Sequence, residues 1–355
     1  MTGPVLITGG AGFVGCNLAD SFLGDGHDVI VFDALSRQGV ETNLAWLRKK
    51  HGARVRAVIA DIRDATAVDE AVLDASAVIH LAAQVAVTSS LEAPLEDFSI
   101  NGQGTLNVLE ALRRKRGETP LLFASTNKVY GHLGQTALTS ADDRYEPLDH
   151  NVRQFGISEA QPLDFATPYG CSKGVADQYV VDYSRTFDLK TAVLRMSCIY
   201  GPRQFGTEDQ GWVAHFLIRA LSGEPITIYG DGRQVRDVLH VSDAVQAYRS
   251  VLNAIDRCSG RAFNLGGGPS NAVSLRILLK EIRALLGREV MATYADWRPG
   301  DQLYFVADTR RLTRELGWSA TIGWRQGLRD LASWIEDHGE VIRKANRPAP
   351  ARLIA

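Results

Sequence analysis

The first fifteen residues constrain the fold of this chain more than any other segment. A short apolar run, residues 5–8, leads into Gly-Gly-Ala-Gly-Phe-Val-Gly at 9–15, and a helix-compatible run follows. In such a strand–turn–helix unit Gly9 permits a tight turn, Gly12 lets a pyrophosphate approach the backbone, and Gly15 lets helix and strand pack closely. Free N–H groups at the start of the helix favour phosphate. The unit predicts a parallel sheet that binds a dinucleotide.

A second apolar run, residues 28–32, ends at Asp33. A carboxylate in this place holds a ribose 2′-hydroxyl and repels a 2′-phosphate, so we expect NAD rather than NADP as the cofactor. Arg37 lies close enough in the sequence to weaken that preference. The glycines alone would fit a simple tight turn, but the strand before them, the helix after them and Asp33 together favour the nucleotide.

Short apolar strands alternate with amphipathic helices along most of the chain. Strands are expected at 5–8, 28–32, 55–59, 77–81, 120–125 and 190–196, and helices near 12–24, 64–73, 94–115, 168–187 and 242–255. This alternation is typical of βαβ units, so we predict an α/β fold: a Rossmann-type doubly wound parallel sheet.

The pattern changes after residue 200 into shorter elements, with strands at 226–229 and 235–239 and helices after Ser274 and Thr309. We expect a smaller C-terminal α/β substrate-binding domain. The predicted boundaries are 1–200 plus 241–266 for the NAD-binding domain and 201–240 plus 267–355 for the substrate domain. The tail from Asn346 is expected to be loose.

Composition and charge indicate an ordinary enzyme. The chain has 355 residues, 45% of them hydrophobic, and a formal net charge of −2, which gives no reason to expect nucleic acid or anionic membranes as partners. The four cysteines show no metal-like spacing, so we expect reduced thiols, no metal and a cytoplasmic location. The N-terminus lacks signal-peptide features, and no apolar stretch reaches the ~18 residues of a membrane span.

Thr126, Tyr169 and Lys173 indicate redox chemistry. Tyr169 and Lys173 lie four residues apart in Thr-Pro-Tyr-Gly-Cys-Ser-Lys, so on a helix they share one face. An ammonium beside a phenol stabilises the phenolate, and we expect it to lower the pKa of Tyr169. Such a tyrosine can take a proton from an alcohol while a hydride leaves the same carbon. Thr126 follows a buried strand and would steady that hydroxyl, whereas Cys171 points to a different helix face.

Further motifs occur in order along the chain: Asp61-Ile62-Arg63-Asp64, His80-Leu-Ala-Ala-Gln84, Asn101, and Ser125-Thr126 before Val129-Tyr130-Gly131. With the glycine turn and the Tyr169/Lys173 pair, they make residues 4–335 resemble the extended short-chain dehydrogenase/reductases that act on nucleotide sugars. The resemblance implies that Asp61 and Ile62 cradle adenine, that residues 82–84 line the nicotinamide side, and that Lys173 also holds the nicotinamide ribose.

The motifs and this resemblance together give one set of expected cofactor contacts. It comprises Gly9, Gly12, Phe13, Val14, Asp33, Ser36, Arg37, Asp61, Ile62, Leu81, Ala82, Ala83, Gln84, Asn101, Ser125, Tyr169, Lys173 and Met196.

The residues after Thr126 separate subgroups of that family. Sugar 4,6-dehydratases carry Asp-Glu there, an acid/base pair that expels water, whereas this chain has Asn127 and Lys128. A lysine cannot replace that pair, so dehydratase chemistry is disfavoured. Lys128 is expected near the substrate's hydroxyls or phosphate; the alternative is a solvated lysine at the end of a strand.

Long segments resemble those of the CDP-tyvelose (CDP-paratose) 2-epimerases, a subgroup of the family. They are residues 32–37, 125–131, 163–174, 197–206 and 208–213. The resemblance implies transient oxidation at C2 of a CDP-linked hexose or deoxyhexose, rotation of the keto sugar, and return of the hydride to the opposite face. There is no net redox change, so NAD can stay bound.

The resemblance also implies where the nucleotide sugar binds. Arg236 is the expected diphosphate clamp, Arg298 would meet phosphate, and Asp301 would meet a ribose hydroxyl; either arginine could instead form a surface ion pair. The full set of expected substrate contacts is Thr126, Asn127, Lys128, Gln204, Arg236, Arg298 and Asp301. Gln210 and Trp212 are pocket candidates that could equally serve packing. Met196 stands where relatives often carry a polar residue, which leaves the accepted sugar open.

Other readings remain open at this stage. One is a nucleotide-sugar 4-epimerase, or another NAD-dependent sugar epimerase, with a UDP or GDP donor. A second is a net dehydrogenase that releases NADH, and a third is a non-catalytic NAD-sensing protein, which the presence of Thr126, Tyr169 and Lys173 opposes. The family resemblance further implies a homodimer or homotetramer formed by the helices near 94–115 and 168–187.

Overall fold

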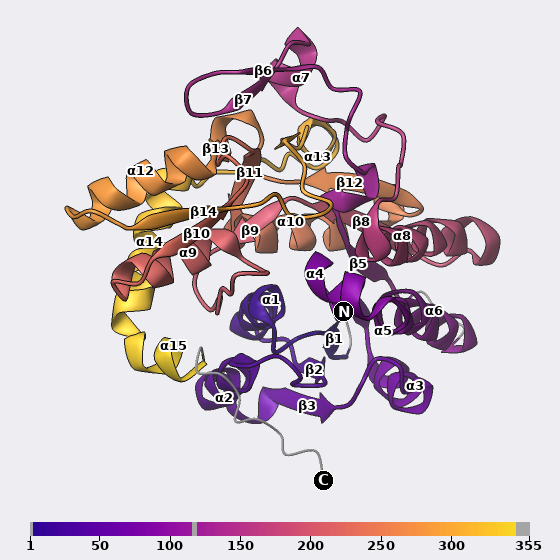
Figure 1. Cartoon of the computed structure of the whole chain (residues 1–355). Coiled ribbons are helices and arrows are strands. Elements are labelled where there is room, and N and C mark those ends of the chain that lie inside the picture. The colour runs from indigo at the N-terminus through magenta and orange to yellow at the C-terminus, as the bar shows by residue number, and fades with distance from the viewer. Residues whose placement is uncertain (1–2, 116–118, 346–355) are drawn as a thin grey trace.

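The computed structural model describes residues 3–115 and 119–345 and is built around one parallel sheet (Figure 1). The strands of this sheet are β1 (Val5–Thr8), β2 (Val29–Asp33), β3 (Val55–Ile59), β4 (Ala77–His80), β5 (Leu121–Thr126), β8 (Thr191–Met196) and β12 (Arg261–Leu265). They lie in the order β12-β8-β5-β4-β1-β2-β3. The predicted Rossmann-type fold is confirmed, and each expected strand is present with its ends shifted by no more than one residue.

The chain changes direction across the sheet between β1 and β4. It runs from β1 outward to β2 and β3, then returns to β4 on the other side of β1. Thr8, the last residue of β1, pairs with Phe32 of β2 and with His80 of β4. The glycine turn, Asp33 and the segment after His80 therefore emerge at one edge of the sheet, where open α/β sheets bind ligands.

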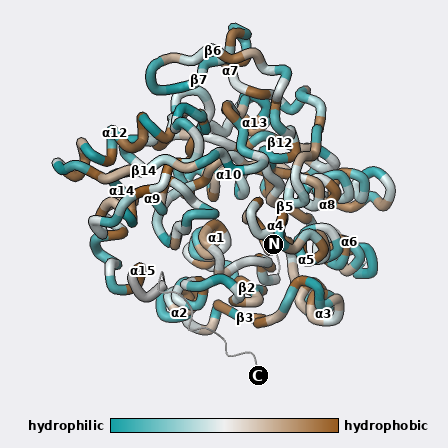
Figure 2. The backbone as a smooth tube through the Cα atoms, viewed as in Figure 1, coloured by the Kyte–Doolittle hydropathy of each residue, from teal (hydrophilic) through white to brown (hydrophobic). Residues whose placement is uncertain are grey.

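Helices cover both faces of the sheet (Figure 1). On one face lie α1 (Phe13–Gly24), α2 (Val40–His51) and α10 (Val241–Asn253); on the other lie α3 (Ala65–Asp74), α6 (Gly104–Lys115) and α8 (Thr167–Phe187). Strands buried on both faces read as continuous apolar runs, as β1 does. Figure 2 shows brown and teal residues alternating along surface helices such as α6, because only one face of each is buried.

The expected helix at 94–115 is interrupted. It is divided into α5 (Pro94–Phe98), a π-helical turn (Ser99–Gln103) and α6. The side chain of Asn101 in that turn bonds to two other segments, and these tertiary bonds hold the wider turn in place. The helices that were not among the expected ones include α2, α4 (Val87–Glu92), α9 (Trp212–Leu221) and α14 (Trp324–Asp337).

The C-terminal part contains short strands and an apolar core of its own. Its strands are β9 (Cys198–Tyr200), β10 (Ile226–Tyr229), β11 (Val235–His240), β13 (Ala272–Ser274), β14 (Ala292–Ala295) and β15 (Tyr304–Phe305). Its helices are α9, α11 (Ile255–Cys258), α12 (Leu275–Leu286), α13 (Arg310–Leu316), α14 and α15 (Gly339–Ala345). Ser274 caps α12 by accepting from Ile277 N at 3.1 Å, as a helix start requires.

A short segment between β5 and α8 in the sequence lies beside this C-terminal part. It comprises β6 (Leu138–Ser140), β7 (Tyr145–Pro147) and α7 (His150–Phe155), and Tyr145 N donates to Arg233 O at 3.0 Å. The domain boundaries given above stay a prediction, and the tail from Asn346 lies outside the described residues. Within the part of the chain that the structure describes, no helix is long and apolar enough to cross a membrane.

Candidate active site

Two cavities meet at the carboxyl edge of the central sheet. The larger, of about 690 Å³, lies over the glycine turn and the ends of β2 and β4. The smaller, of about 400 Å³, lies between the sheet and the C-terminal part. Both are lined by Phe13, Val14, Val85, Met196 and Gln204, so a ligand in one can reach a ligand in the other.

The glycine turn forms the floor of the larger cavity. Gly9 has a φ of +67°, and a Cβ there would lie 2.8 Å from Ala82 N. A Cβ on Gly15 would lie 2.2 Å from Gly9 O, so α1 can start this close to β1 only with glycine there. Gly12 lines the cavity, and a Cβ there would meet nothing but Gly9 O, at 3.1 Å. Gly9 and Gly15 match the expected tight turn and close packing, and the approach of a pyrophosphate at Gly12 stays a prediction.

Most of the expected cofactor residues line this larger cavity. They are Gly9, Gly12, Phe13, Val14, Asp33, Ser36, Arg37, Asp61, Ile62, Leu81, Ala82, Ala83, Gln84 and Met196. The Asp33 carboxylate accepts from Ala11 N at 3.0 Å and from Leu35 N at 2.9 Å, which fixes its orientation. Ser125 and Tyr169 line the smaller cavity instead, and Asn101 and Lys173 line neither, because both are buried beneath the site.

Thr126 and Tyr169 line the smaller cavity, and Thr126 pairs in the sheet with Met196, which lines both cavities. Thr126 ends β5, and its hydroxyl hydrogen-bonds the phenol of Tyr169, which stands in the first turn of α8 and is 8% exposed. The prediction that Tyr169 has a lowered pKa is wrong when the groups of the protein itself are considered. Burial raises that pKa to about 12, and Asp97 raises it further, while the Thr126 hydrogen bond lowers it only in part.

Lys173 does not offset this effect because burial disfavours its own charge. Its Nζ donates to Ala124 O at 2.7 Å and lies 4.1 Å from the centre of the Phe123 ring. Burial lowers the pKa of Lys173 to about 7, against the opposing influence of Asp177 and Asp97. The ammonium and the phenol share one helix face, as expected, but the amine is directed at the backbone of β5.

Asn127 and Lys128 both face the smaller cavity. Asn127 donates to Gln302 Oε1 at 3.2 Å, and Lys128 Nζ donates to Gly300 O at 2.9 Å. Burial is the main cause of a Lys128 pKa lowered to about 8; Arg236 lowers it further, while Asp301 raises it. The alternative of a solvated lysine at a strand end is therefore wrong.

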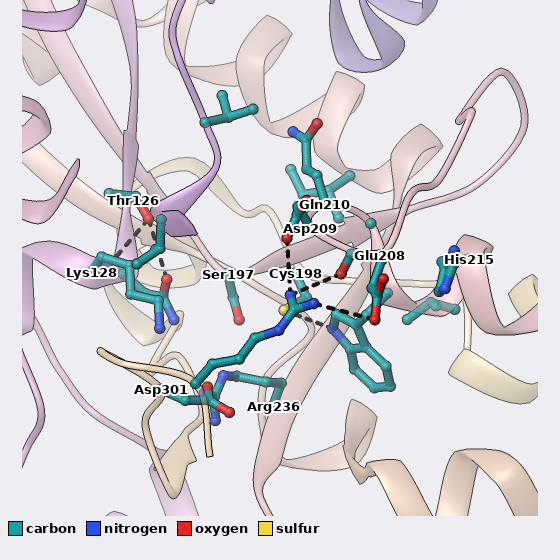
Figure 3. Close-up of a pocket in the computed structure, with 18 of the residues that line it drawn as sticks. Thr126, Lys128, Ser197, Cys198, Glu208, Asp209, Gln210, His215, Arg236 and Asp301 are labelled. Atoms are coloured by element: carbon teal, nitrogen blue, oxygen red, sulfur yellow. Dashed lines mark hydrogen bonds and ion pairs between the residues drawn. The ribbon is translucent and has the colours of Figure 1, made fainter. Parts of the chain in front are cut away.

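Arginines and carboxylates pair on the opposite wall of the smaller cavity (Figure 3). Arg236 of β11 binds Asp301 at 2.6 Å. Arg298 lies between Glu208, at 3.6 Å, and Asp209, at 3.3 Å, and its guanidinium covers the Tyr229 ring at 3.8 Å. Arg236, Arg298 and Asp301 thus lie together as expected, although Asp301 is already paired with an arginine.

The sequence was then compared with those of known proteins. A profile described as the NAD dependent epimerase/dehydratase family matches residues 5–266. The chain belongs to this family. The CDP-paratose 2-epimerase of Salmonella typhi is 42% identical over 337 residues, which cover 93% of this chain and 98% of the relative.

Solved structures of similar proteins agree with that assignment. The UDP-glucose 4-epimerase of Thermotoga maritima with UDP-glucose has a TM-score of 0.81 at 29% identity, covering 94% of this chain and 99% of its own. The UDP-glucose 4-epimerase of Thermus thermophilus in complex with NAD has a TM-score of 0.77 at 30% identity, with the same coverage. The expectations of an NAD-dependent enzyme and of a likeness to CDP-tyvelose (CDP-paratose) 2-epimerases are confirmed.

The larger cavity of this epimerase/dehydratase family member fits NAD. Gly12 leaves room for phosphate at the start of α1, whose first N–H groups have no side-chain cap. The oriented Asp33 carboxylate lies where a ribose would follow, and the loop at 82–84 lines the wall toward Tyr169. No residue that lines the cavity contradicts the expected cofactor.

Sequence reasoning missed several residues of this family member's site. Glu208 and Asp209 were noticed only as part of a matching segment, and Cys198, which accepts a hydrogen bond from Trp212 Nε1 at 3.3 Å, was treated as an ordinary thiol. Asp97 was not singled out at all, although it lies beneath the catalytic helix. An acidic residue between two apolar ones, Leu95 and Phe98, was the available signal. Gln210 and Trp212 both line the smaller cavity.

Proposed function

We propose that this protein is an NAD-dependent nucleotide-sugar 2-epimerase that acts on a CDP-linked hexose or deoxyhexose, of the CDP-paratose to CDP-tyvelose type. The observation that carries the proposal is the hydrogen-bonded Thr126–Tyr169 pair in the smaller cavity, beside Met196, which lines both cavities. A sugar in the smaller cavity can there present a hydroxyl to the phenol and a carbon to the cofactor. The 42% identity to a CDP-paratose 2-epimerase favours C2 and a CDP donor.

The reaction is an oxidation followed by its reversal on the other face. When bound, NAD would supply the hydride acceptor. Tyr169, as the phenolate, takes the proton of the 2-hydroxyl while the C2 hydride leaves, and a 2-keto sugar forms. After the sugar rotates, the hydride returns to the opposite face of C2 and Tyr169 returns the proton, so atoms and electrons balance. Thr126 holds the reacting oxygen in both steps.

Lys173 favours the phenolate as long as it is charged. In this role its ammonium lies on the same face of α8 as Tyr169 and one turn further along. Since burial has lowered its pKa to about 7, the charge is easily lost, and nearby carboxylates oppose that loss. The acid/base function of Tyr169 therefore depends on Asp97 and Asp177 as well as on Lys173.

Rotation of the sugar requires a firm grip on the nucleotide and a loose one on the ring. Arg236 and Arg298 would provide the grip, because their planar donors match phosphate oxygens in pairs. A diphosphate would then replace Asp301 on Arg236, and Glu208 and Asp209 on Arg298. Lys128, with its amine in the same cavity, would add a third positive charge.

A nucleotide-sugar 4-epimerase is the second candidate. It is favoured by the likeness to UDP-glucose 4-epimerases of solved structure, and it would use the same three catalytic residues. The two reactions differ only in which hydroxyl faces Tyr169. A non-catalytic NAD sensor is disfavoured, because it would have no use for a buried phenol, hydroxyl and amine arranged in this way.

We also propose a homodimer or homotetramer that associates through α5 and α8. Leu95 and Phe98 of α5 are 86% and 50% exposed, and Tyr179 and Phe187 of α8 are 46% and 43% exposed, so an apolar surface spans these neighbouring helices. Apolar groups gathered on one face mark interaction surfaces. Light scattering on the purified protein tests this; a mass of one chain would contradict it.

The function is tested by proton NMR of the purified protein with CDP-paratose, CDP-glucose and UDP-glucose, each without added cofactor. We expect a product whose H1–H2 and H2–H3 couplings show inversion at C2. Inversion at C4 would identify a 4-epimerase instead. The roles proposed for Thr126, Tyr169 and Lys173 would then be unchanged. Accumulation of NADH only after NAD is supplied would identify a net dehydrogenase.

A further inference from the structure

A buried carboxylate lies directly beneath the catalytic helix. Asp97 of α5 is 1% exposed, and its hydrogen-bond donors among the described residues are all uncharged side chains. Its two oxygens accept three hydrogen bonds: from Ser172 Oγ at 2.5 Å, from Asn101 Nδ2 at 3.1 Å and from Gln84 Nε2 at 3.1 Å. A carboxylate can accept all three of these hydrogen bonds; burial raises the pKa of Asp97, and the Ser172 hydrogen bond and Lys173 oppose that rise.

Each of the three donors belongs to a different part of the site. Ser172 stands on α8, one residue before Lys173 and three after Tyr169. Gln84 stands in the loop after β4 that lines the cofactor cavity. Asn101 stands in the π-helical turn, and its amide also binds Gln84 at both backbone atoms, accepting from N at 2.9 Å and donating to O at 3.0 Å. Asp97 therefore ties the catalytic helix to the cofactor loop.

The same network continues under the glycine turn, and its hydrogens can be assigned. Thr8 Oγ1 accepts from Leu81 N and Ala82 N, so its own hydrogen goes to His80 Nδ1 at 2.6 Å. Burial lowers the pKa of His80 to about 3, so the ring is neutral and carries its hydrogen on Nε2. That Nε2 donates to Thr105 Oγ1 at 3.0 Å.

The direction of donation is preserved as far as the π-helical turn. Thr105 Oγ1, having accepted from His80, donates to Asn101 O at 2.6 Å. The Asn101 amide then donates to Asp97, and Ser172 does the same from α8. Asp97 accepts from the side chains of Gln84, Asn101 and Ser172, so it orients these three groups directly.

We propose that Asp97 is a positioning residue for the catalytic centre: it locks α8 to the cofactor-lining loop and holds negative charge under Tyr169 and Lys173. Without it, Ser172 and Gln84 lose their common partner, and the phenol and the cofactor loop are free to shift relative to each other. Shifts on the scale of an ångström are enough to slow a hydride transfer strongly. The proposal rests on the proposed function only for its kinetic readout.

The charged and titratable groups around Lys173 can be named from every element packed against it. Asp97 comes from α5, Asp177 and Tyr169 from α8, and His80 from β4, while Arg195 of β8 is engaged by Asp177 at 2.8 Å. Asp97 raises the pKa of both Lys173 and Tyr169. Neutralising Asp97 therefore lowers both pKa values, so Tyr169 ionises at lower pH and Lys173 loses its charge at lower pH.

Asp97→Asn is a substitution that the network can absorb. The new Oδ1 still accepts from Gln84 and Asn101, and the new amide donates to Ser172 Oγ. The Ser172 hydroxyl can then turn to Tyr169 O, which already lies 3.2 Å away. Asp243→Asn is the matched control, because Asp243 is also buried and accepts from Thr321 and Ile322, but far from the cavities.

The test uses the full chain saturated with NAD. Asp97→Asn keeps the hydrogen bonds of the network and removes the charge that helps to hold Lys173 protonated, so we expect kcat to fall about tenfold with KM within about twofold. The Tyr169 titration, followed by tyrosinate absorbance against a Tyr169→Phe background, should move down by about one pH unit. Asp243→Asn should change neither. Wild-type kcat and titration in Asp97→Asn would overturn the proposal and leave Asp97 a core residue.

Two further measurements test the proposal if the protein epimerises none of the tested donors or if Asp97→Asn does not fold. The tyrosinate titration needs no sugar, so a protein that fails to epimerise any tested donor still tests the position of Asp97. If Asp97→Asn does not fold, Ser172→Ala keeps the anion and removes only its link to α8. We then expect kcat to fall about threefold to tenfold with the Tyr169 titration unchanged; wild-type kcat in Ser172→Ala would overturn the proposal.

Discussion

The two cavities are built in different ways. Most of the larger one is lined by short segments at the ends of neighbouring strands: the glycine turn, the end of β2 and the loop after β4, together with residues of the segment 203–210. The smaller one is formed by charged side chains from segments far apart in the sequence, such as Lys128, Glu208, Arg236 and Arg298. The cofactor side is shaped by where side chains are missing, and the substrate side by how charges are paired.

This difference indicates how each side can change. The glycine turn tolerates few substitutions, because an added Cβ would collide with its backbone. This constraint suits a cofactor that a whole family shares. Charged residues that are paired with each other before the substrate binds can be exchanged one at a time, which suits a site whose donor differs among relatives. We therefore expect changes on the substrate side to alter KM and changes on the cofactor side to alter NAD retention.

The largest effect is expected at the proposed acid/base residue. Tyr169→Phe keeps the ring but removes the phenolic oxygen, so kcat should fall by about 10³-fold while bound NAD is retained. NMR turnover and the NAD content of the purified protein measure the two quantities. Tyr179→Phe, an exposed position on the same helix, is the control. Residual turnover within tenfold of wild type would remove Tyr169 from its acid/base role.

On the substrate side, Arg236→Ala should raise KM by about 100-fold and leave NAD content unchanged. Arg236 is 7% exposed and its loss strands Asp301, a change that costs roughly 2–5 kcal/mol at a ligand site. Arg298 shares two carboxylates nearer the surface, so Arg298→Ala should raise KM only about tenfold. Arg233→Ala is the control on the same segment. Equal effects of all three would contradict the diphosphate clamp.

On the cofactor side, Gly15→Ala should release NAD without changing the KM of the sugar once NAD is saturating. The new Cβ would lie 2.2 Å from Gly9 O, so the turn must move. Such overpacking costs about 2 kcal/mol, or roughly a 30-fold loss of NAD affinity. Gly24→Ala, in the same helix with nothing within 4 Å of its Cβ, should bind NAD normally. Full NAD retention in Gly15→Ala would show that the turn is pliable.

The smallest effect is a pH dependence on the substrate side. The pKa of Lys128 is lowered to about 8, so its positive charge is lost as the pH rises through that value. If the ammonium binds substrate, kcat/KM of the free enzyme should fall about fivefold between pH 8 and 9. Lys128→Arg keeps its charge at these pH values, so the fall should disappear. A flat profile in the wild type would place the amine away from the substrate.

The same comparison explains what the sequence could predict. The glycine turn, Asp33 and the Tyr169/Lys173 pair lie in short local patterns, and the structure puts them where the patterns indicate. The ion pairs of Arg298 with Glu208 and Asp209 join positions about 90 residues apart, which no local pattern reveals. The π-helical turn at Asn101 depends on bonds to Gln84 and Ser172 from other elements.

The direction of the Tyr169 pKa shift was predicted wrongly for a related reason. Sequence spacing gives the distance from Tyr169 to Lys173 along a helix, but it gives neither the depth of burial nor the carboxylate below. Burial raises the pKa of the phenol and lowers that of the ammonium, and in both cases it is the largest cause. Asp97 adds to the rise for Tyr169, and no local pattern around Tyr169 reveals it.

The strand order also determines how much of the chain must be present before the central sheet is complete. β12 completes the central sheet beside β8, yet it is reached only after β9, β10 and β11 of the smaller part have been made. A ribosome that has released the first 240 residues has delivered β8 with an open edge, and open edges pair with other chains. A truncation at that point would therefore aggregate, and a vector that encodes only the nucleotide-binding half must carry residues 261–265 as well.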